Sequence, residues 1–234
     1  LHRVVRVSLF LLTCLVLMIS LRDVTLALLS DRLLELGVYG LLTAFALVFS
    51  APLSRGEQSI AHVIGMVAFL SLPAAVAPTM TVALFLGALV GSIGLNLFDR
   101  YPHERQGRTI DLIDMIYITS GITLSFFAAS RIYILFNGTL PLTTGIDVVA
   151  NLVPLLAYVT IYVVLYVVGV LLRLDDKGYI LRESMATLTI VLSLPVPFAL
   201  IGASVARSDE SLLFFTITIV GITLIIFGLY VLNY

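Results

Sequence analysis

Charged residues and cysteine are both scarce in this chain of 234 residues. Only 12% of the residues are charged, about half the share found in soluble domains, whereas 60% are hydrophobic. The formal net charge of −1 excludes the basic footprint that nucleic-acid binding needs, so we predict no nucleic-acid partner. Cys14 is the single cysteine, which excludes a disulfide, a CxxC redox pair and a cage of thiolate ligands within one chain.

Catalytic motifs are also absent from the sequence. There is no HExxH, no GxSxG, no Walker loop and no glycine-rich dinucleotide fingerprint, and the three histidines are far apart. Asp111 and Asp114 share a helix face, but their place at a helix start, just after Arg108, favours a solvated turn over acid–base or metal chemistry. We therefore predict no enzyme activity, no cofactor and no metal site.

Long apolar runs are what the sequence has in abundance. A bilayer core of about 30 Å needs about 20 helical residues, and open strands cannot satisfy their backbone in lipid. We therefore predict an all-α polytopic membrane protein, a single membrane-integral domain over 1–234, with the lipid bilayer as its surroundings. About eight transmembrane helices are expected, over 4–21, 33–53, 58–76, 78–98, 110–136, 148–172, 184–206 and 212–234.

The two ends of the chain carry expectations of their own. Arg3 and Arg6 precede the apolar stretch Val7–Leu21, as in a signal peptide. A small-x-small cleavage site is lacking, which favours a first transmembrane helix. The chain begins with Leu1 and stops at Tyr234 within an apolar run, which suggests an excerpt of a longer protein. The alternative is an unusual start codon and a short tail.

Lysine and arginine are distributed unevenly between the two sides of the predicted membrane. Eight spans put nine of these cations on the side of the termini and four on the other, which predicts cytoplasmic termini in a plasma (inner) membrane. The nine are Arg3, Arg6, Arg55, Arg100, Arg105, Arg108, Arg173, Lys177 and Arg182. The four are Arg22, Arg32, Arg131 and Arg207.

A short sequence echo suggests an internal repeat. Leu70–Pro73 returns as Leu192–Pro195, and Arg55-Gly56 as Lys177-Gly178, at one offset of 122 residues. The expected halves are 1–109 and 110–234, two parallel four-helix units, although chance identity in a leucine-rich chain is the alternative. Prolines near the echo are predicted hinges, and the short run 58–76 is predicted to cross fully before a tight outer turn, with a re-entrant loop as the alternative. The four hinge residues are Pro73, Pro78, Pro195 and Pro197.

Small residues recur along the fourth predicted span. Ala83, Gly87 and Gly91 are spaced by four, with Gly94 beside them, so they form one face that permits close helix approach. The expected partner is another span of the same chain, and a homodimer partner is the alternative.

Two sets of polar residues are candidate ligand contacts. Arg131, Asn137, Asp147 and Asn151 are predicted to form an outward-facing polar pocket in which Arg131 pairs with Asp147 or with an anionic ligand. The alternative for Arg131 is a side chain that reaches the membrane interface. In the sixth span, Asn151, Tyr158, Tyr162 and Tyr166 follow one helix face and suit a flat ligand, with packing on a neighbouring helix as the alternative.

Three short motifs carry a resemblance to a known class. Val48–Leu53 (VFSAPL) precedes a glycine-bearing turn, a short run closes at Leu72-Pro73-Ala74, and Phe136-Asn137 leads into a loop. The pattern resembles the multi-span sensory regions that precede HD-GYP, GGDEF or histidine-kinase output domains in bacterial signalling proteins. The resemblance implies a non-catalytic input module that relays a stimulus to a cytoplasmic output domain in cis.

Two other classes fit the same composition. Proline-interrupted spans at matching places in two repeats are also typical of secondary transporters, so a small-molecule transporter or a substrate-binding permease subunit is one alternative. A structural subunit of a larger membrane complex is the other, because that role requires no motif.

Overall fold

The computed structural model describes residues 2–22, 26–49, 51–53, 56–58, 61–97, 112–173 and 195–233. These residues are overwhelmingly helical, as the apolar runs predict, and one two-stranded sheet accompanies the helices. The elements are α1 (His2–Arg22), α2 (Leu26–Val48), β1 (Ala51–Leu53), β2 (Gly56–Gln58), α3 (Ala61–Ser71), a 3-10 turn η1 (Ala74–Val76), α4 (Ala77–Leu97), α5 (Leu112–Leu135), α6 (Gly145–Ala150), α7 (Leu152–Arg173), α9 (Pro195–Val205) and α10 (Asp209–Asn233).

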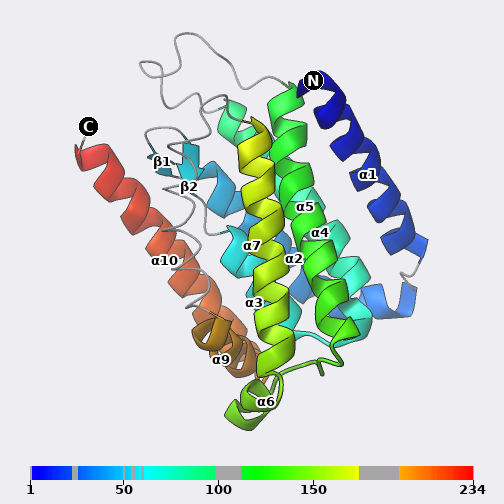
Figure 1. Ribbon diagram of the computed structural model, residues 1–234. Helices are drawn as coiled ribbons and strands as arrows, with labels where there is room; N and C mark the ends of the chain where they lie inside the picture. The colour runs from blue at the N-terminus through cyan, green and yellow to red at the C-terminus, as the bar shows by residue number, and fades with distance from the viewer. Residues whose placement is uncertain are drawn as a thin grey trace.

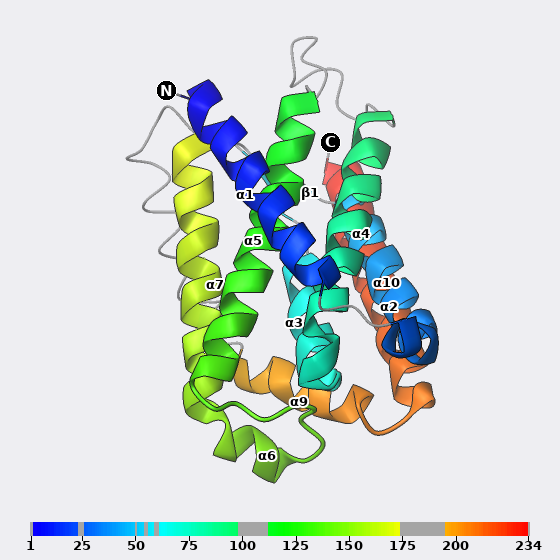
Figure 2. The ribbon, with the colours of Figure 1, turned by 90° about the vertical axis from the view of Figure 1, so that its right-hand side faces the viewer.

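The long helices run side by side along one bundle (Figures 1 and 2). The first residue of α1 and the last residue of α10 lie at the same end of this bundle, which we call the terminal end. At the opposite end, which we call the distal end, α6 and α9 cover the bundle, and Figure 2 shows α9 lying across it. At about 1.5 Å per residue, the 21 residues of α4 extend about 31 Å, close to the thickness of a bilayer core.

The short helix α3 forms the centre of the core. It packs against α2, α4, α5 and α9, and nearly all of its residues are buried. Its faces show no strong apolar-to-polar contrast, as expected of a helix surrounded by neighbours. Helices on the outside of the bundle therefore enclose a segment that is itself entirely apolar apart from His62 and Ser71.

The region between α2 and α3 differs from the prediction. The expected span 33–53 is wrong at both ends, because α2 occupies Leu26–Val48 and an antiparallel pair of strands follows it. The start was misplaced because polar residues such as Asp31 and Arg32 interrupt the apolar run, although a helix can contain them. Pro52 has no N–H for a helical hydrogen bond and instead pairs with Glu57 across the two strands.

The expected full-length third span is also shorter than predicted. Eleven residues give α3 a length of about 16 Å, half a bilayer core. The chain still progresses through the bundle here, since the strands lie nearer the terminal end and α4 begins at the distal end (Figures 1 and 2). Pro73 ends the segment as the N-terminal cap of η1, where its fixed φ of −58° is already suitable.

The two predicted halves do not share one helix pattern over the described residues. At the offset of 122, the continuous helix α4 corresponds to the end of α9, a bend and the start of α10. The reason is local: polar residues Arg207–Glu210 stand where α4 has Phe85–Ala88. The echo at Lys177, Gly178 and 192–194 lies outside the described residues.

One described segment is both long and apolar enough to cross a membrane. It covers Ala74–Gly94, joining η1 to most of α4. Among the residues whose side chains are described, its length and composition alone make this segment a candidate span.

Candidate functional site

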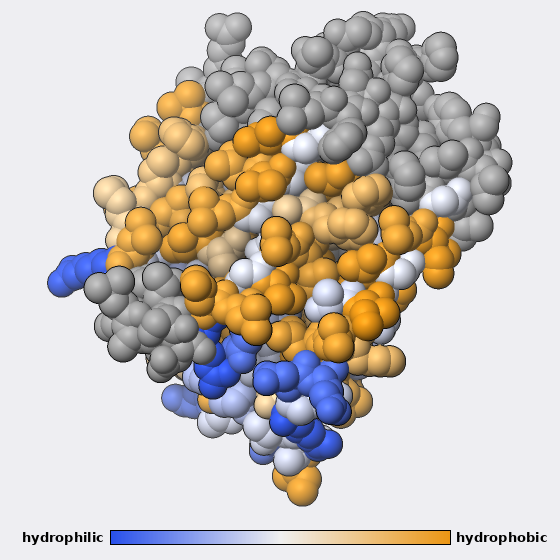
Figure 3. Space-filling model, turned by 180° about the vertical axis from the view of Figure 1, so that it is seen from behind, coloured by the Kyte–Doolittle hydropathy of each residue, from blue (hydrophilic) through white to orange (hydrophobic). Residues whose placement is uncertain are grey.

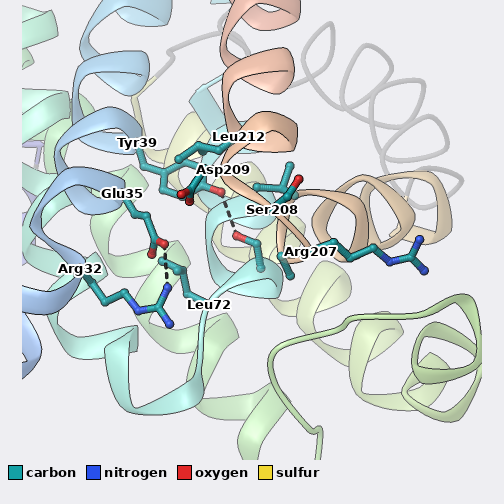
Figure 4. Close-up of a pocket in the computed structure, with 11 residues that line it drawn as sticks. Arg32, Glu35, Tyr39, Leu72, Arg207, Ser208, Asp209 and Leu212 are labelled. Atoms are coloured by element: carbon teal, nitrogen blue, oxygen red, sulfur yellow. Dashed lines mark hydrogen bonds and ion pairs between the residues drawn. The ribbon is translucent and has the colours of Figure 1, made fainter.

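A polar pocket opens at the distal end of the bundle. Its volume is about 290 Å³, and it lies where α2, the turn after α3 and the bend between α9 and α10 meet (Figure 4). The lining residues are Arg32, Glu35, Tyr39, Ser71, Leu72, Val205, Ala206, Arg207, Ser208, Asp209 and Leu212.

The helix α2 supplies the charged wall of this distal pocket. Arg32, Glu35 and Tyr39 are spaced by three and four residues, so one helix face presents all three. The Arg32 Nη1 donates to Glu35 Oε1 at 2.7 Å, and the two side chains are 42% and 20% exposed. The second carboxylate oxygen, Glu35 Oε2, is buried and has no hydrogen-bond partner among the described residues. The ion pair thus leaves one buried acceptor unsatisfied.

A chain of hydroxyl groups connects α2 to α3 at the base of the pocket. Ser71 Oγ donates to the Ala68 carbonyl at 3.2 Å, so its only proton is used there. The hydroxyl of Tyr39, 2.8 Å from Ser71 Oγ, must therefore be the donor in that bond and keeps its own lone pairs. The Tyr39 ring also packs against Phe215 of α10, with ring centroids 6.3 Å apart. Tyr39 consequently contacts two other helices.

The bend between α9 and α10 forms the opposite wall. Ser208 Oγ accepts from the Ser211 N–H at 3.2 Å and so satisfies a free donor at the start of α10. Asp209 and Glu210 occupy the first helical turn, where negative charge complements the helix dipole. Arg207 turns away from the pocket, as Figure 4 shows, and its Nε donates to the Thr143 carbonyl at 2.8 Å. The charges left facing the pocket are those of Arg32, Glu35 and Asp209.

The predicted pocket of Arg131, Asn137, Asp147 and Asn151 is divided among separate environments. Arg131 lies 5.0 Å above the Phe127 ring and lines a groove of about 310 Å³ formed with the turn before α4. The other three are not among the residues that line that groove. The prediction of one shared cavity is therefore not reproduced, because Asp147 and Asn151 form hydrogen bonds within the loop after α5 and the side chain of Asn137 is exposed.

Asp147 lies in the first turn of the short helix α6, whose N-cap is Thr144. Its carboxylate accepts from the Thr143 Oγ1 at 2.9 Å and from the backbone N–H groups of Thr143 and Thr144 at 3.0 and 2.8 Å. Its own N–H donates to Thr144 Oγ1, which completes a capping box. Hydrogen bonds from the side chain and backbone of Thr143, and then from Thr144, lower the pKa of this carboxyl.

Asn137 and Asn151 shape the same loop. Asn137 has a positive φ of 57°, a left-handed conformation that asparagine tolerates, and its side chain is exposed. Asn151 is 4% exposed, accepts from the Thr139 N–H at 2.7 Å and donates to the Asp147 carbonyl at 2.8 Å. Its amide holds the loop to the start of α7, which is a structural role.

The tyrosines of α7 lie in the core between α3 and α7. Tyr158 is 1% exposed and stacks on Phe69 at 5.2 Å, and Tyr162 is 8% exposed. The hydroxyl of Tyr162 lies 2.6 Å from His62 Nδ1, so it bonds across to the neighbouring helix. Neither ring lines the distal pocket. The side chain of Tyr166 lies outside the described set.

The glycines of α4 lie against α2 rather than on an open surface. A Cβ on Gly87 would be 2.2 Å from the Gly40 carbonyl oxygen, and one on Gly91 would be 2.8 Å from that of Ala44. A Cβ on Gly94 would be 2.6 Å from Val48 Cγ2. The small-residue face, which also includes Ala83 opposite Gly40, is thus occupied within the chain.

The predicted hinge prolines all stand at helix starts. Pro73 precedes η1, and Pro78 lies in the first turn of α4. Pro195 and Pro197 lie in the first turn of α9. A missing N–H costs nothing in a first turn, so these prolines begin helices at the distal end.

The residues of the distal pocket escaped prediction, although a signal was present. Glu35 lies inside the predicted span 33–53, and Arg32 is one residue before it. An ionisable residue in such a run is a functional candidate by default. Asp209 and Ser71 carry no comparable signal, because only folding brings the α9–α10 bend to the end of α3.

Comparison with known protein families, with curated proteins and with solved structures finds no match. The function must therefore be argued from the site. Over the part of the chain that the structure describes, no group of three or more His, Cys, Asp or Glu side chains could hold a metal ion. The arrangement of the distal pocket suits reversible binding of a small polar molecule through charge-assisted hydrogen bonds.

Proposed function

We propose that this chain is a polytopic, membrane-integral sensory domain that binds a small polar ligand in the distal pocket. Binding shifts α10, and α10 relays the shift to a cytoplasmic output domain. The observation that carries the proposal is the position of the pocket. It is built on the bend where α10 begins, at the end of the bundle opposite both termini.

An apolar belt supports the membrane assignment. Figure 3 shows hydrophobic surface across the middle of one face and hydrophilic surface at the distal end. Soluble monomers rarely expose contiguous apolar patches larger than a few hundred Å². Large apolar side chains are highly exposed on several helices. They include Leu11, Met18, Leu34, Leu41, Val90, Val153, Phe214 and Ile217.

The orientation is argued from the Lys and Arg of the sequence, nine on the side of the termini against four on the other side under the eight-span prediction. Of those four, Arg32 lines the distal pocket, Arg131 lies in the last turns of α5 and Arg207 follows α9, so these three lie at the distal end. Cytoplasmic segments are the ones enriched in Lys and Arg, so the distal pocket faces the outside.

The packing of α10 supports a relay through this helix. It contacts α2, α9 and β1 and lies at the side of the bundle (Figure 1). Tyr39 joins the pocket to Phe215 of α10 directly. A ligand that changes the separation of α2 and the α9–α10 bend would therefore reposition α10 as a rigid body.

A fusion of the full chain to a diguanylate cyclase reporter, joined after α10, tests the relay. We expect Glu35→Gln to change the cyclase output about fivefold or more, the scale of a typical coupling free energy. Glu210→Gln is the matched control, since Glu210 is a neighbouring acid that does not line the pocket. Equal output from the parent and both variants would contradict the relay.

A transport assay separates the proposal from its main alternative. The purified chain is reconstituted in proteoliposomes and incubated with radiolabelled amino acids and sugars. A sensory domain accumulates none of them. Uptake that Glu35→Gln abolishes would instead assign the distal pocket to a transporter.

A further inference from the structure

We propose that the ligand of the distal pocket is a small zwitterion with an ammonium group and a carboxylate, such as a free amino acid. This inference rests on the proposed function and names the chemical class of its ligand. The inference is argued from the ion pair of Arg32 and Glu35. After the pair forms, Glu35 still has an unpaired acceptor oxygen, and Arg32 still has N–H donors.

The acceptor side of the site is Glu35 with Tyr39. Glu35 Oε1 is occupied by Arg32, whereas the buried Oε2 has no partner among the described residues. An unpaired buried carboxylate oxygen is costly, so the site is incomplete without a donor. The Tyr39 oxygen donates to Ser71 and retains lone pairs beside the same pocket. An ammonium group, with three donors, satisfies both acceptors at once.

The donor side of the site is Arg32. A guanidinium has five N–H groups, and the contact of Arg32 with Glu35 uses Nη1 alone. Its side chain is 42% exposed, so the remaining N–H groups are accessible from the mouth of the pocket. Carboxylates bind such a fork through two parallel hydrogen bonds.

The charge and size of the pocket favour a zwitterion over a simple ion. With the Arg207 side chain turned toward Thr143, the charges left at the pocket are one positive, from Arg32, and two negative, from Glu35 and Asp209. The start of α10 offsets part of the charge of Asp209 with about half a positive charge. The balance near neutrality disfavours a ligand with a large net charge. The volume of about 290 Å³ restricts the ligand to a small molecule.

Binding to the purified full chain in lipid nanodiscs tests the proposal. Each standard amino acid is screened by its effect on the thermal unfolding midpoint, and the best one is titrated by calorimetry. Ethanolamine, which has only the ammonium group, and lactate, which has only the carboxylate, are titrated alongside. We expect the amino acid to bind about tenfold or more tightly than either, because each half forms a charge-assisted bond.

Four variants, one of them the Glu210→Gln control, locate the binding site. Glu35→Gln and Arg32→Gln are each expected to weaken amino-acid binding about tenfold or more, whereas Glu210→Gln leaves it unchanged. Arg32→Lys keeps the charge but loses the planar fork, so it retains folding and loses most of the carboxylate contribution. Unfolding midpoints of the free variants verify that each is folded.

Two results would overturn the assignment. One is the absence of binding by every standard amino acid at millimolar concentration. The other is binding that Glu35→Gln and Arg32→Lys both leave intact. Binding without any effect on the cyclase reporter would uphold the ligand class and refute the relay, so the two proposals fail separately.

Discussion

At the scale of single residues, one close contact between helices is made where a side chain is missing. Gly87 of α4 lies against the backbone of Gly40 in α2, and a Cβ there would be 2.2 Å from a carbonyl oxygen. That atom belongs to the backbone, so it cannot turn aside as the end of a long side chain would. The α2–α4 contact, which also positions the charged face of α2, therefore depends on glycine at this position.

Gly87→Ala is expected to destabilise the protein by about 1–3 kcal/mol, because one extra methyl group separates two packed helices. The thermal unfolding midpoint in detergent measures the loss. Gly121→Ala in α5 is the matched control, since no atom lies within 4 Å of its added Cβ. Alanine is favoured over glycine in a helix, so the control is expected to be neutral or slightly stabilising. Equal losses in both variants would contradict the packing argument.

The carboxyl of Asp147 leads to a prediction of how the stability of the fold depends on pH. Its folded pKa is lowered from 3.8 by hydrogen bonds from Thr143 and Thr144, so ionisation stabilises the folded loop. That contribution is complete above the unfolded pKa and is lost as the pH falls through the folded pKa. Asp147→Asn is therefore expected to lower the unfolding midpoint at neutral pH, with the difference from the parent shrinking at acid pH.

Proteolysis of the loop after α5, followed from neutral to acid pH, offers a second measurement of the same effect. Asp209→Asn is a suitable comparison, as Asp209 is an exposed acid in a first helical turn that has no such set of threonine donors. A difference between parent and Asp147→Asn that stays constant down to the most acid pH would contradict the assignment.

Single residues can be placed from the sequence where residue spacing alone decides which side chains share a helix face. Glycines four residues apart necessarily share a helix face, and Gly87 and Gly91 do lie against one neighbour. Asp147 and Asn151 have side chains of the right kind for ligand binding, but backbone donors in their own loop compete for them. No spacing rule reveals that competition. Glu35 was recognisable as a charge in an apolar run, whereas its unpaired oxygen depends on tertiary structure.

At the scale of elements, the packing of α9 on α3 positions one wall of the distal pocket. Gly202 faces the end of α3, and a Cβ added there would be 2.9 Å from Leu70 Cβ. The Leu70 carbonyl also accepts the N–H of Leu142 at 2.9 Å, so α3, α9 and the loop after α5 meet at one place. The bend that follows α9 lines the pocket, and its position is set by this contact.

Gly202→Val is expected to displace α9 from α3 and to destabilise the protein by about 1–3 kcal/mol through overpacking. The same variant should weaken ligand binding, because the bend at Arg207 and Ser208 moves with α9. Gly221→Ala in α10, where no atom lies within 4 Å of the added Cβ, controls for the loss of a glycine. Unfolding midpoints together with calorimetric titration of both variants measure the two effects. Normal binding by a destabilised Gly202→Val would separate the pocket from α9.

Element boundaries were predictable where a proline or a polar stretch ends an apolar run. The expected runs 78–98 and 110–136 differ by one or two residues at each end from α4 and α5. Boundaries failed where a helix continues into polar sequence, as α2 does through Arg32, or where backbone geometry decides, as at Pro52. The hydropathy of a segment reports its surroundings and does not report where its hydrogen bonds end.

At the scale of the whole molecule, the ends of the bundle differ in chemistry. The distal end contains the pocket, the α6 cap and three arginines, and the terminal end receives both ends of the chain. An even number of crossings follows from any membrane arrangement with both termini on one side. Composition and charge predict such a membrane arrangement, because the bilayer constrains span length and cation placement, and it stays a prediction here.

Cysteine labelling in intact cells tests the arrangement directly. In a Cys14→Ser background, Ile146→Cys places one thiol on α6, where the parent side chain is 80% exposed. On the proposed orientation, which places the distal end outside the cell, a membrane-impermeant maleimide is expected to label it without permeabilisation. A cysteine in a tag after Tyr234 should react only once the cells are permeabilised, since positive-inside placement keeps the terminal end cytoplasmic. Labelling of the tag in intact cells, with Ile146→Cys protected, would reverse the orientation and turn the distal pocket toward the cytoplasm.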